Sequence, residues 1–357
     1  MGAARSRPDG RPEETESTVR QHLDFIVIGA QKSGTTSLFE YLRRHPQLCL
    51  PAGKEVPYFS HDANYGRDWE GYLRKAFPFV DPACKWGTVT PHYMVGGIYD
   101  AAAADGCADC GDERTVPLRI HGMLPDARLI AIIRDPVQRA RSHHAMAVMN
   151  GWDSRDFTQA ARELLRPDAL VRARRRPAET TGYVVWGEYG RILAGYLGVF
   201  RRDQILVLYT SDLKDNPAEA MRSVYEFLDV DAGFEPDNLG TTYRPHAPTR
   251  RLRWLDLDAV QSAVSENRAA RALWHSIPER SRRRIDSRFD RVNYLTDLWN
   301  RRPGTVRAST DDDTEHELRT HYQQDSERLA ELFGVVPPWI SRVGSHSGQE
   351  PKVARSA

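Results

Sequence analysis

Eight residues near the start of the chain carry the strongest chemical signal in the sequence. They are Gly29, Ala30, Gln31, Lys32, Ser33, Gly34, Thr35 and Thr36. An apolar run precedes them and a helical pattern follows. A strand that opens into a helix through a glycine-containing loop presents free backbone N–H groups to an anion. We therefore predict a phosphate site made by Lys32, Ser33, Gly34, Thr35 and Thr36.

The position of the lysine decides which kind of phosphate site this is. A Walker A loop places its lysine directly after the second glycine, followed by Ser or Thr. Here Lys32 precedes Gly34, and no convincing acidic partner for magnesium follows. The order disfavours a P-loop kinase, although that class and a non-catalytic nucleotide-binding module both remain as alternatives.

A second group of phosphate ligands follows about a hundred residues later. Arg134 ends an apolar run, Asp135 and Pro136 open a helix, and Ser142 lies two turns into that helix. Ligands of open α/β sheets bind at the carboxyl ends of the strands. A forked guanidinium and a hydroxyl suit a phosphate monoester, so Arg134 and Ser142 predict a second phosphate site.

The elements that position these groups are predicted from apolar runs and helical spacing. Continuous apolar runs at 25–28, 129–133 and 205–209 predict buried parallel strands. Helices are predicted after 34, from Pro136, from Pro217 after an Asn216 cap, and from 318 to a stop at Gly334. This alternation predicts an α/β fold: a P-loop-like parallel sheet flanked by helices on both faces, with a helical insertion.

Composition predicts the limits of the folded domain, the class of partner and the cellular compartment. Tails low in apolar residues are expected at 1–22 and 344–357, around one domain at 23–340 with a helical insertion or lid at 245–300. A net charge of +1 argues against nucleic acid as a partner. We expect no membrane span, and four cysteines predict a reducing cytoplasm, with Cys107 and Cys110 in a loop. Arginine far outnumbers lysine, which is typical of a bacterial, GC-rich gene.

With these motifs the chain resembles the sulfotransferases that use 3′-phosphoadenosine 5′-phosphosulfate (PAPS). QKSGTTSL after FIVIGA and the later IIRDPVQRARS carry the resemblance. The segments KEVPYF at 54–59 and TPHY at 90–93 are similar to the heparan sulfate glucosaminyl branch. The resemblance implies that the first loop holds the 5′-phosphosulfate, that the Arg134–Ser142 segment holds the 3′-phosphate, and that adenosine 3′,5′-bisphosphate is the product.

The resemblance also implies the catalytic roles. Glu55 would be the general base and Lys32 would stabilise charge on the leaving phosphate, while no metal is required. We expect the apolar neighbours of Glu55 to raise its pKa towards neutrality. His92 is the reserve base, because imidazole titrates in the right range. Tyr189 and Arg307 are weaker contacts to cofactor or acceptor.

The acceptor is the least determined part of this interpretation. The heparan-type segment that ends in Thr-Pro carries Glu-Lys before it, whereas Val89 and Thr90 stand here. The cysteines of that branch's disulfide loop are also missing. We therefore predict a hydroxyl of a small molecule, such as a bacterial secondary metabolite or glycoside, as acceptor. A carbohydrate or glycolipid hydroxyl is the alternative.

Overall fold

A parallel sheet organises the computed structural model, which describes residues 22–51, 53–61, 64–77, 83–95, 114–243 and 311–340. The predicted tails, the 245–300 insertion, Arg307, Cys107 and Cys110 lie outside these ranges, apart from residue 22. The strands are β1 (Phe25–Gly29), β2 (Leu48–Cys49), β3 (Lys85–Val89), β4 (Arg128–Ile133) and β5 (Ile205–Tyr209). Their order in the sheet is β2-β3-β1-β4-β5.

Every strand pairing in this sheet is parallel. β1 pairs with β3 on one side and with β4 on the other, and β5 completes that edge beside β4. The expected parallel α/β sheet and its three apolar strands are therefore confirmed. Parallel neighbours end at the same edge, so the loops after β1, β3 and β4 are brought together there.

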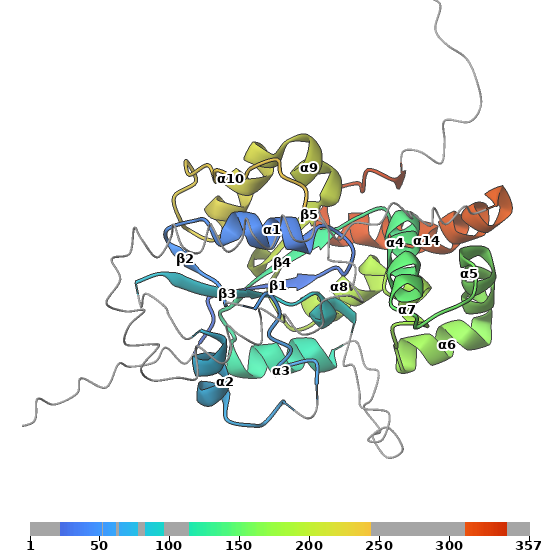
Figure 1. Cartoon of the computed structure of the whole chain (residues 1–357), viewed down its shortest axis with the longest axis horizontal. Coiled ribbons are helices and arrows are strands. Elements are labelled where there is room, and N and C mark those ends of the chain that lie inside the picture. The colour runs from blue at the N-terminus through green and yellow to red at the C-terminus, as the bar shows by residue number, and fades with distance from the viewer. Residues whose placement is uncertain are drawn as a thin grey trace, which may run out of the picture.

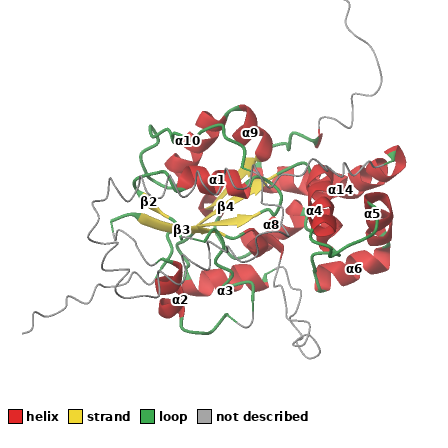
Figure 2. Cartoon of the chain, in the orientation of Figure 1, coloured by secondary structure: helices red, strands yellow, loops and turns green. Residues whose placement is uncertain are grey.

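Helices cover both faces of the sheet (Figures 1 and 2). One face carries α1 (Thr35–Leu42), α9 (Thr210–Asp215) and α10 (Pro217–Phe227). The other carries α2 (Trp69–Ala76), α3 (Thr115–Met123) and α8 (Tyr189–Leu197). Side chains of successive strand residues alternate between the faces, so Ile26 and Ile28 enter one buried cluster while Phe25 and Val27 enter the other.

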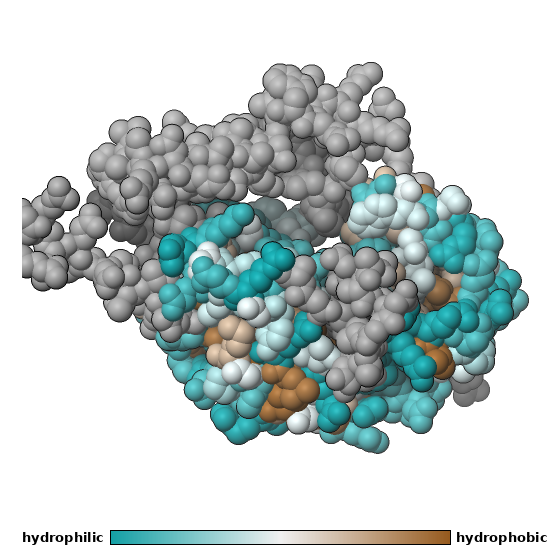
Figure 3. Space-filling view, turned by 90° about the horizontal axis from the view of Figure 1, so that it is seen from below, coloured by the Kyte–Doolittle hydropathy of each residue, from teal (hydrophilic) through white to brown (hydrophobic). Residues whose placement is uncertain are grey.

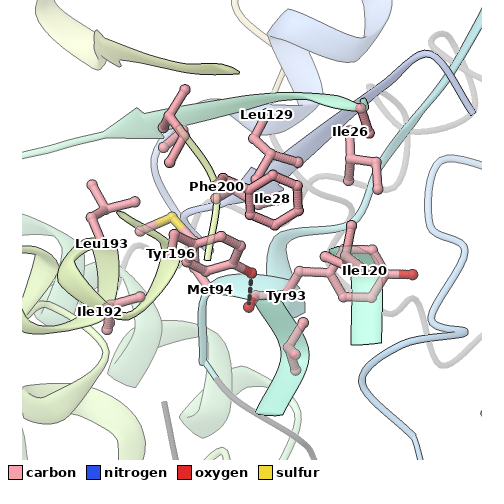
Figure 4. Close-up of a cluster of buried hydrophobic side chains, with 14 of the residues drawn as sticks. Ile26, Ile28, Tyr93, Met94, Ile120, Leu129, Ile192, Leu193, Tyr196 and Phe200 are labelled. Carbon is pink, nitrogen blue, oxygen red and sulfur yellow. Dashed lines mark hydrogen bonds between the residues drawn. The ribbon is translucent and has the colours of Figure 1, made fainter. Parts of the chain in front are cut away.

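The larger cluster is centred under β1 and β4 (Figure 4). Ile28 and Leu129 from the strands meet aromatic side chains from the segments below. The Tyr196 hydroxyl, on α8, donates to the backbone carbonyl of Tyr93 at 2.6 Å. This bond satisfies a buried hydroxyl and ties α8 to the segment that carries His92.

A lateral group of helices lies to one side of the sheet (Figure 1). It contains α4 (Pro136–Met149), α5 (Phe157–Leu165), α6 (Pro167–Arg175), α7 (Gly182–Val185) and the long α14 (Asp312–Phe333). Two short 3₁₀ segments, η1 (Pro91–Val95) and η2 (Arg202–Gln204), complete the described elements. α14 packs against α8, close to Gly190 near the start of α8.

Most of the predicted helix boundaries are confirmed. The Asp135 carboxylate accepts from the amides of Val137 and Gln138, with Pro136 in the first turn. Gly334 ends α14 in the left-handed conformation at φ 70°. Asn216 does stand at the start of α10, but its side chain makes no capping hydrogen bond, contrary to expectation.

The face formed by α2 and α3 is predominantly hydrophilic, with small separate hydrophobic areas (Figure 3). Leu118 of α3 is 53% exposed, which is usual for a single surface leucine. No helix within the described ranges is long and apolar enough to cross a membrane.

Candidate active site

The loop after β1 has the geometry of an anion site. Lys32 and Gly34 both have positive φ, at 67° and 96°. Glycine adopts this conformation at little cost, and here it stands at the cap position of α1. In the described part of the chain no side chain caps this helix, so its first amide groups remain available to an anion.

Neighbouring strands fix the loop in place. The Ala30 amide donates to the Ile132 carbonyl on β4 at 2.7 Å. The Thr210 hydroxyl, at the start of α9 directly after β5, donates to the Ser33 carbonyl at 2.6 Å and to the Ile133 carbonyl at 3.0 Å. The loop is therefore anchored to β4 and to the start of α9, both distant in sequence, which orders it before any ligand binds.

Lys32 is held in an environment that disfavours its charge. Burial, followed by repulsion from Lys54, lowers the pKa of Lys32 to about 8. Glu179 opposes this shift, whereas Arg134 and Arg139 add to it. Several cations that face one another in a partly buried site gain stability when an anion joins them, so the electrostatics fit a phosphate ligand.

Two buried hydroxyls lie beside the loop. Ser33 is 0% exposed and Tyr189 is 1% exposed. The two hydroxyls are close to one another, but among the described residues neither makes a well-formed hydrogen bond. Tyr189 can thus reach a ligand only through its hydroxyl next to Ser33, because its ring is part of the core.

The second predicted pair stands on adjoining elements. Arg134 follows β4 and donates to Gln138 Oε1 at 3.0 Å. Ser142 is half-buried on α4, on the second turn as predicted. Because β4 adjoins β1, Arg134 and the Lys32 loop meet at one edge of the sheet, with enough proximity for Arg134 to influence the pKa of Lys32.

Lys54 connects this loop to the predicted base. Its ammonium lies 3.2 Å from Thr35 Oγ1 and 3.3 Å from Thr36 Oγ1. It also lies 3.4 Å from Glu55 Oε1. The segment is held from behind, where the Val56 amide donates to Thr90 Oγ1 at 3.0 Å. The Lys54 side chain therefore lies between Glu55 and the anion loop and contacts both.

The electrostatic state of Glu55 differs from the expectation. Its side chain is 40% exposed, and although burial alone raises its pKa, hydrogen bonding to His92 and the charge of Lys54 lower it overall. The prediction of a raised pKa was wrong, because the cationic neighbours outweigh desolvation. Glu55 is ionised throughout the physiological range.

His92 lies between two carboxylates. Its Nδ1 is 3.5 Å from Glu55 Oε2, and its Nε2 is 3.3 Å from Glu179 Oε1. Burial lowers the pKa of His92, but hydrogen bonds to Glu179 and Glu55 raise it to about 9. With a pKa of about 9, His92 is protonated at neutral pH and cannot take a proton from an acceptor, so its electrostatics do not favour the role of reserve base.

Glu179 is a site residue that the sequence did not predict. It follows an arginine-rich run in the turn between α6 and α7, where no motif marks it. Its contacts with Gln31 and His92 join positions far apart in sequence. The roles of Lys54 as a bridge and of Gln31 as a partner of Glu179 were also not predicted.

Comparison with known proteins gives a consistent result. The family model described as "Sulfotransferase domain" matches residues 22–243. Human heparan sulfate glucosamine 3-O-sulfotransferase 5 is 28% identical over 224 residues, covering 62% of this chain and 57% of that protein. Mouse bifunctional heparan sulfate N-deacetylase/N-sulfotransferase 1 is 28% identical over 223 residues, covering 60% and 23%. The chain thus matches little more than half, or less, of these relatives.

A solved structure shares the fold. The sulfotransferase from Alicyclobacillus acidocaldarius has a TM-score of 0.59 at 20% identity, covering 90% of this chain and 99% of that one. Since the family model extends over more than half of the chain, from β1 through α10, this protein belongs to the sulfotransferase domain family.

Proposed function

We propose that this protein transfers the sulfuryl group of PAPS to an acceptor hydroxyl, with Glu55 as base. One observation carries the proposal: Lys54 Nζ reaches both the Thr35 hydroxyl of the anion loop and the Glu55 carboxylate. Donor loop and base are therefore close enough to act on the two ends of one transfer. Family membership supports the sulfuryl chemistry.

The residues at the loop fit a phosphosulfate. Ser33 offers a buried hydroxyl with no well-formed hydrogen bond in the described structure, and the start of α1 offers free amides. Lys32 supplies a cation whose pKa of about 8 leaves it ready to take up a full charge beside an anion. Arg134 and Ser142 would hold the 3′-phosphate at the adjoining strand end. PAPS supplies the sulfuryl group and a phosphate leaving group.

The reaction needs positioning and charge stabilisation from the protein. The bond from sulfur to the acceptor oxygen forms as the bond from sulfur to the phosphate oxygen breaks. Glu55 takes the proton of the acceptor hydroxyl, and Lys32 stabilises the charge on the departing phosphate. Glu55 is preferred to Glu179 as base because it is more exposed, at 40% against 26%, and its contacts are longer.

The acceptor class is proposed from the relatives and from one departure. Both curated relatives are named for heparan sulfate, which favours a carbohydrate hydroxyl. Val89 directly precedes Thr90 and Pro91, where the heparan-type segment has a lysine, and the missing cation favours an acceptor with less negative charge. A hydroxyl on a small molecule is the second candidate.

The proposal is tested by incubating the protein with PAPS and two acceptor panels. One panel holds oligosaccharides and the other hydroxylated small molecules, and mass spectrometry detects the gain of one SO₃. Product with either panel supports sulfuryl transfer and identifies the acceptor class. Binding of adenosine 3′,5′-bisphosphate without product from any acceptor would favour a non-catalytic module, and tight binding of ATP with magnesium would favour a kinase.

A further inference from the structure

A single carboxylate, Glu179, links three parts of the site. Its Oε1 and Oε2 accept from the side-chain nitrogen Nε2 of Gln31, the residue before Lys32, at 3.2 and 3.3 Å. Oε1 also accepts from His92 Nε2 at 3.3 Å, and Oε2 from His143 Nε2 at 2.7 Å. These partners belong to the anion loop, to η1 beside the base, and to α4 next to Ser142.

The turn that carries Glu179 is itself fixed. The Ala178 amide donates to Thr181 Oγ1 at 3.0 Å, and the Gly182 amide donates to the Ala178 carbonyl at 2.7 Å. From outside the turn, Arg155 donates to the Thr180 carbonyl at 3.1 Å. The carboxylate therefore projects from an ordered backbone, which lets it define the positions of its partners.

His143 is a neutral partner of Glu179. Its Nδ1 lies 3.3 Å from Arg139 Nη1, and because a guanidinium only donates, Nδ1 accepts and Nε2–H donates to Glu179. Its ring is 0% exposed and stacks on Trp186 at 4.7 Å. Burial lowers the pKa of His143 to about 4, so it holds Glu179 without adding charge.

His92 is the charged partner. Its two nitrogens face carboxylate oxygens of Glu55 and Glu179, which only accept, and Nε2 also lies 3.5 Å from Gln31 Nε2, an amide nitrogen that only donates. Because Gln31 Nε2 already donates to Glu179 at 3.2 Å, hydrogen on both His92 nitrogens satisfies the two carboxylates, and the ring is an imidazolium. Lys54, 3.4 Å from Glu55, and Lys32, which Glu179 attracts, are cationic partners of the same two carboxylates. Burial disfavours the charge of His92, so the two carboxylates are what maintain it.

We infer that Glu179 is a positioning residue. It keeps His92 charged and directed at Glu55, and through Gln31 it fixes the position of His92 relative to the anion loop. This inference rests on the proposed function. With its oxygens engaged by three donors, Glu179 is not available to an acceptor. A charged His92 offsets the repulsion between two carboxylates and the sulfuryl oxygens, which a neutral ring does not.

The direct test is the titration of His92 in Glu179→Gln, followed by NMR of ¹³C-labelled histidine, with His92→Asn to assign the signal. We expect His92 of the wild type to titrate near 9. In Glu179→Gln, which keeps the shape and loses the charge, we expect a pKa lower by at least about one unit. Glu179→Asp keeps the charge and should keep most of the elevation.

Kinetics give the second readout. For Glu179→Gln we expect kcat to fall about ten- to a hundredfold at alkaline pH. At acidic pH the decrease in kcat should be smaller, because His92 stays protonated there. The Kd for adenosine 3′,5′-bisphosphate should change less than about threefold, because Lys32 and Arg134 remain. Glu317→Gln, an exposed carboxylate on α14, is the matched control and should behave as wild type.

Three results would overturn the inference. They are a wild-type His92 that titrates at its ordinary value, a titration unchanged in Glu179→Gln, or a loss of bisphosphate binding as large as the loss of kcat. If the wild type forms no sulfated product, the proposed function fails while the His92 titration still reports on Glu179. If Glu179→Gln does not fold, the wild-type and Glu179→Asp titrations decide.

Discussion

His92 Nδ1 lies 3.5 Å from Glu55 Oε2, so the proposed base is paired with an imidazolium. The pairing lowers the pKa of Glu55 below its ordinary 4.5. A carboxylate with a lowered pKa is a weak base in the ground state, but it is fully ionised and held in one orientation. It needs no high proton affinity in the ground state, because the acceptor hydroxyl becomes strongly acidic only as its oxygen bonds to sulfur in the transition state.

Replacement of Glu55 by Gln should therefore remove catalysis and leave donor binding. We expect kcat to fall about 10²- to 10⁴-fold, because the amide cannot take the acceptor's proton. Calorimetry with adenosine 3′,5′-bisphosphate should give a Kd close to that of the wild type, since Glu55 is on the acceptor side. Sulfated product formed by Glu55→Gln at an undiminished rate would show that another group is the base.

Donor binding should depend on pH through Lys32. The pKa of its ammonium in the free protein is lowered to about 8, and a bound phosphate raises it, so the affinity for adenosine 3′,5′-bisphosphate should fall as pH rises through 8. Binding above that pH should take up a proton, detectable by calorimetry in buffers of different ionisation enthalpy. Lys32→Arg, which keeps its charge, should flatten the dependence. A wild-type affinity that is constant across this range would contradict the assignment.

Arg134 should discriminate between ligands with and without a 3′-phosphate. Arg134→Ala should raise the Kd for adenosine 3′,5′-bisphosphate about ten- to a hundredfold, because the ligand loses a hydrogen bond from a charged group. Binding of adenosine 5′-phosphate should change little. Arg162→Ala removes an exposed arginine on α5, 3.3 Å from Asp311, and serves as the control. Equal losses for both nucleotides would place Arg134 elsewhere in the site.

The sequence predicted the part of the sheet that is apolar and continuous. Strands β1, β4 and β5 read as unbroken hydrophobic runs, whereas β3 contains Gly87 and was missed. Glycine is required there because a Cβ would lie 2.1 Å from the ring of Phe25 on β1. This requirement depends on which strand is the neighbour, so strand propensity cannot reveal it.

Prediction of the site had the same limit, because contacts between residues distant in sequence do not follow from local pattern. Lys32 and Arg134 are in motifs whose chemistry follows from local structure at strand ends, so their placement was predictable. Glu179 acts through contacts with Gln31 and His143, which are distant in sequence and carry no motif. The pKa of Glu55 was predicted with the wrong sign because its sequence neighbours are apolar, while His92, its decisive neighbour in space, is a cation.

The contact between α8 and α14 provides a test of the fold that is independent of the chemistry. The Asp325 carboxylate on α14 accepts from the amides of Gly190 and Arg191 at 2.8 Å each. This bonding brings the helices so close that a Cβ on Gly190 would lie 2.2 Å from the Asp325 carbonyl oxygen. Backbone cannot move aside as a side chain can, so we expect Gly190→Ala to lower the free energy of unfolding by about 1–3 kcal/mol. The matched control is Gly198→Ala at the end of the same helix, where φ is −71° and the nearest atom is 3.4 Å from the new Cβ. That variant should be neutral or more stable by about 0.4–1 kcal/mol, because alanine restricts the unfolded chain. Denaturant unfolding of both variants measures the difference, and equal stability of the two would show that α8 and α14 are not packed this closely.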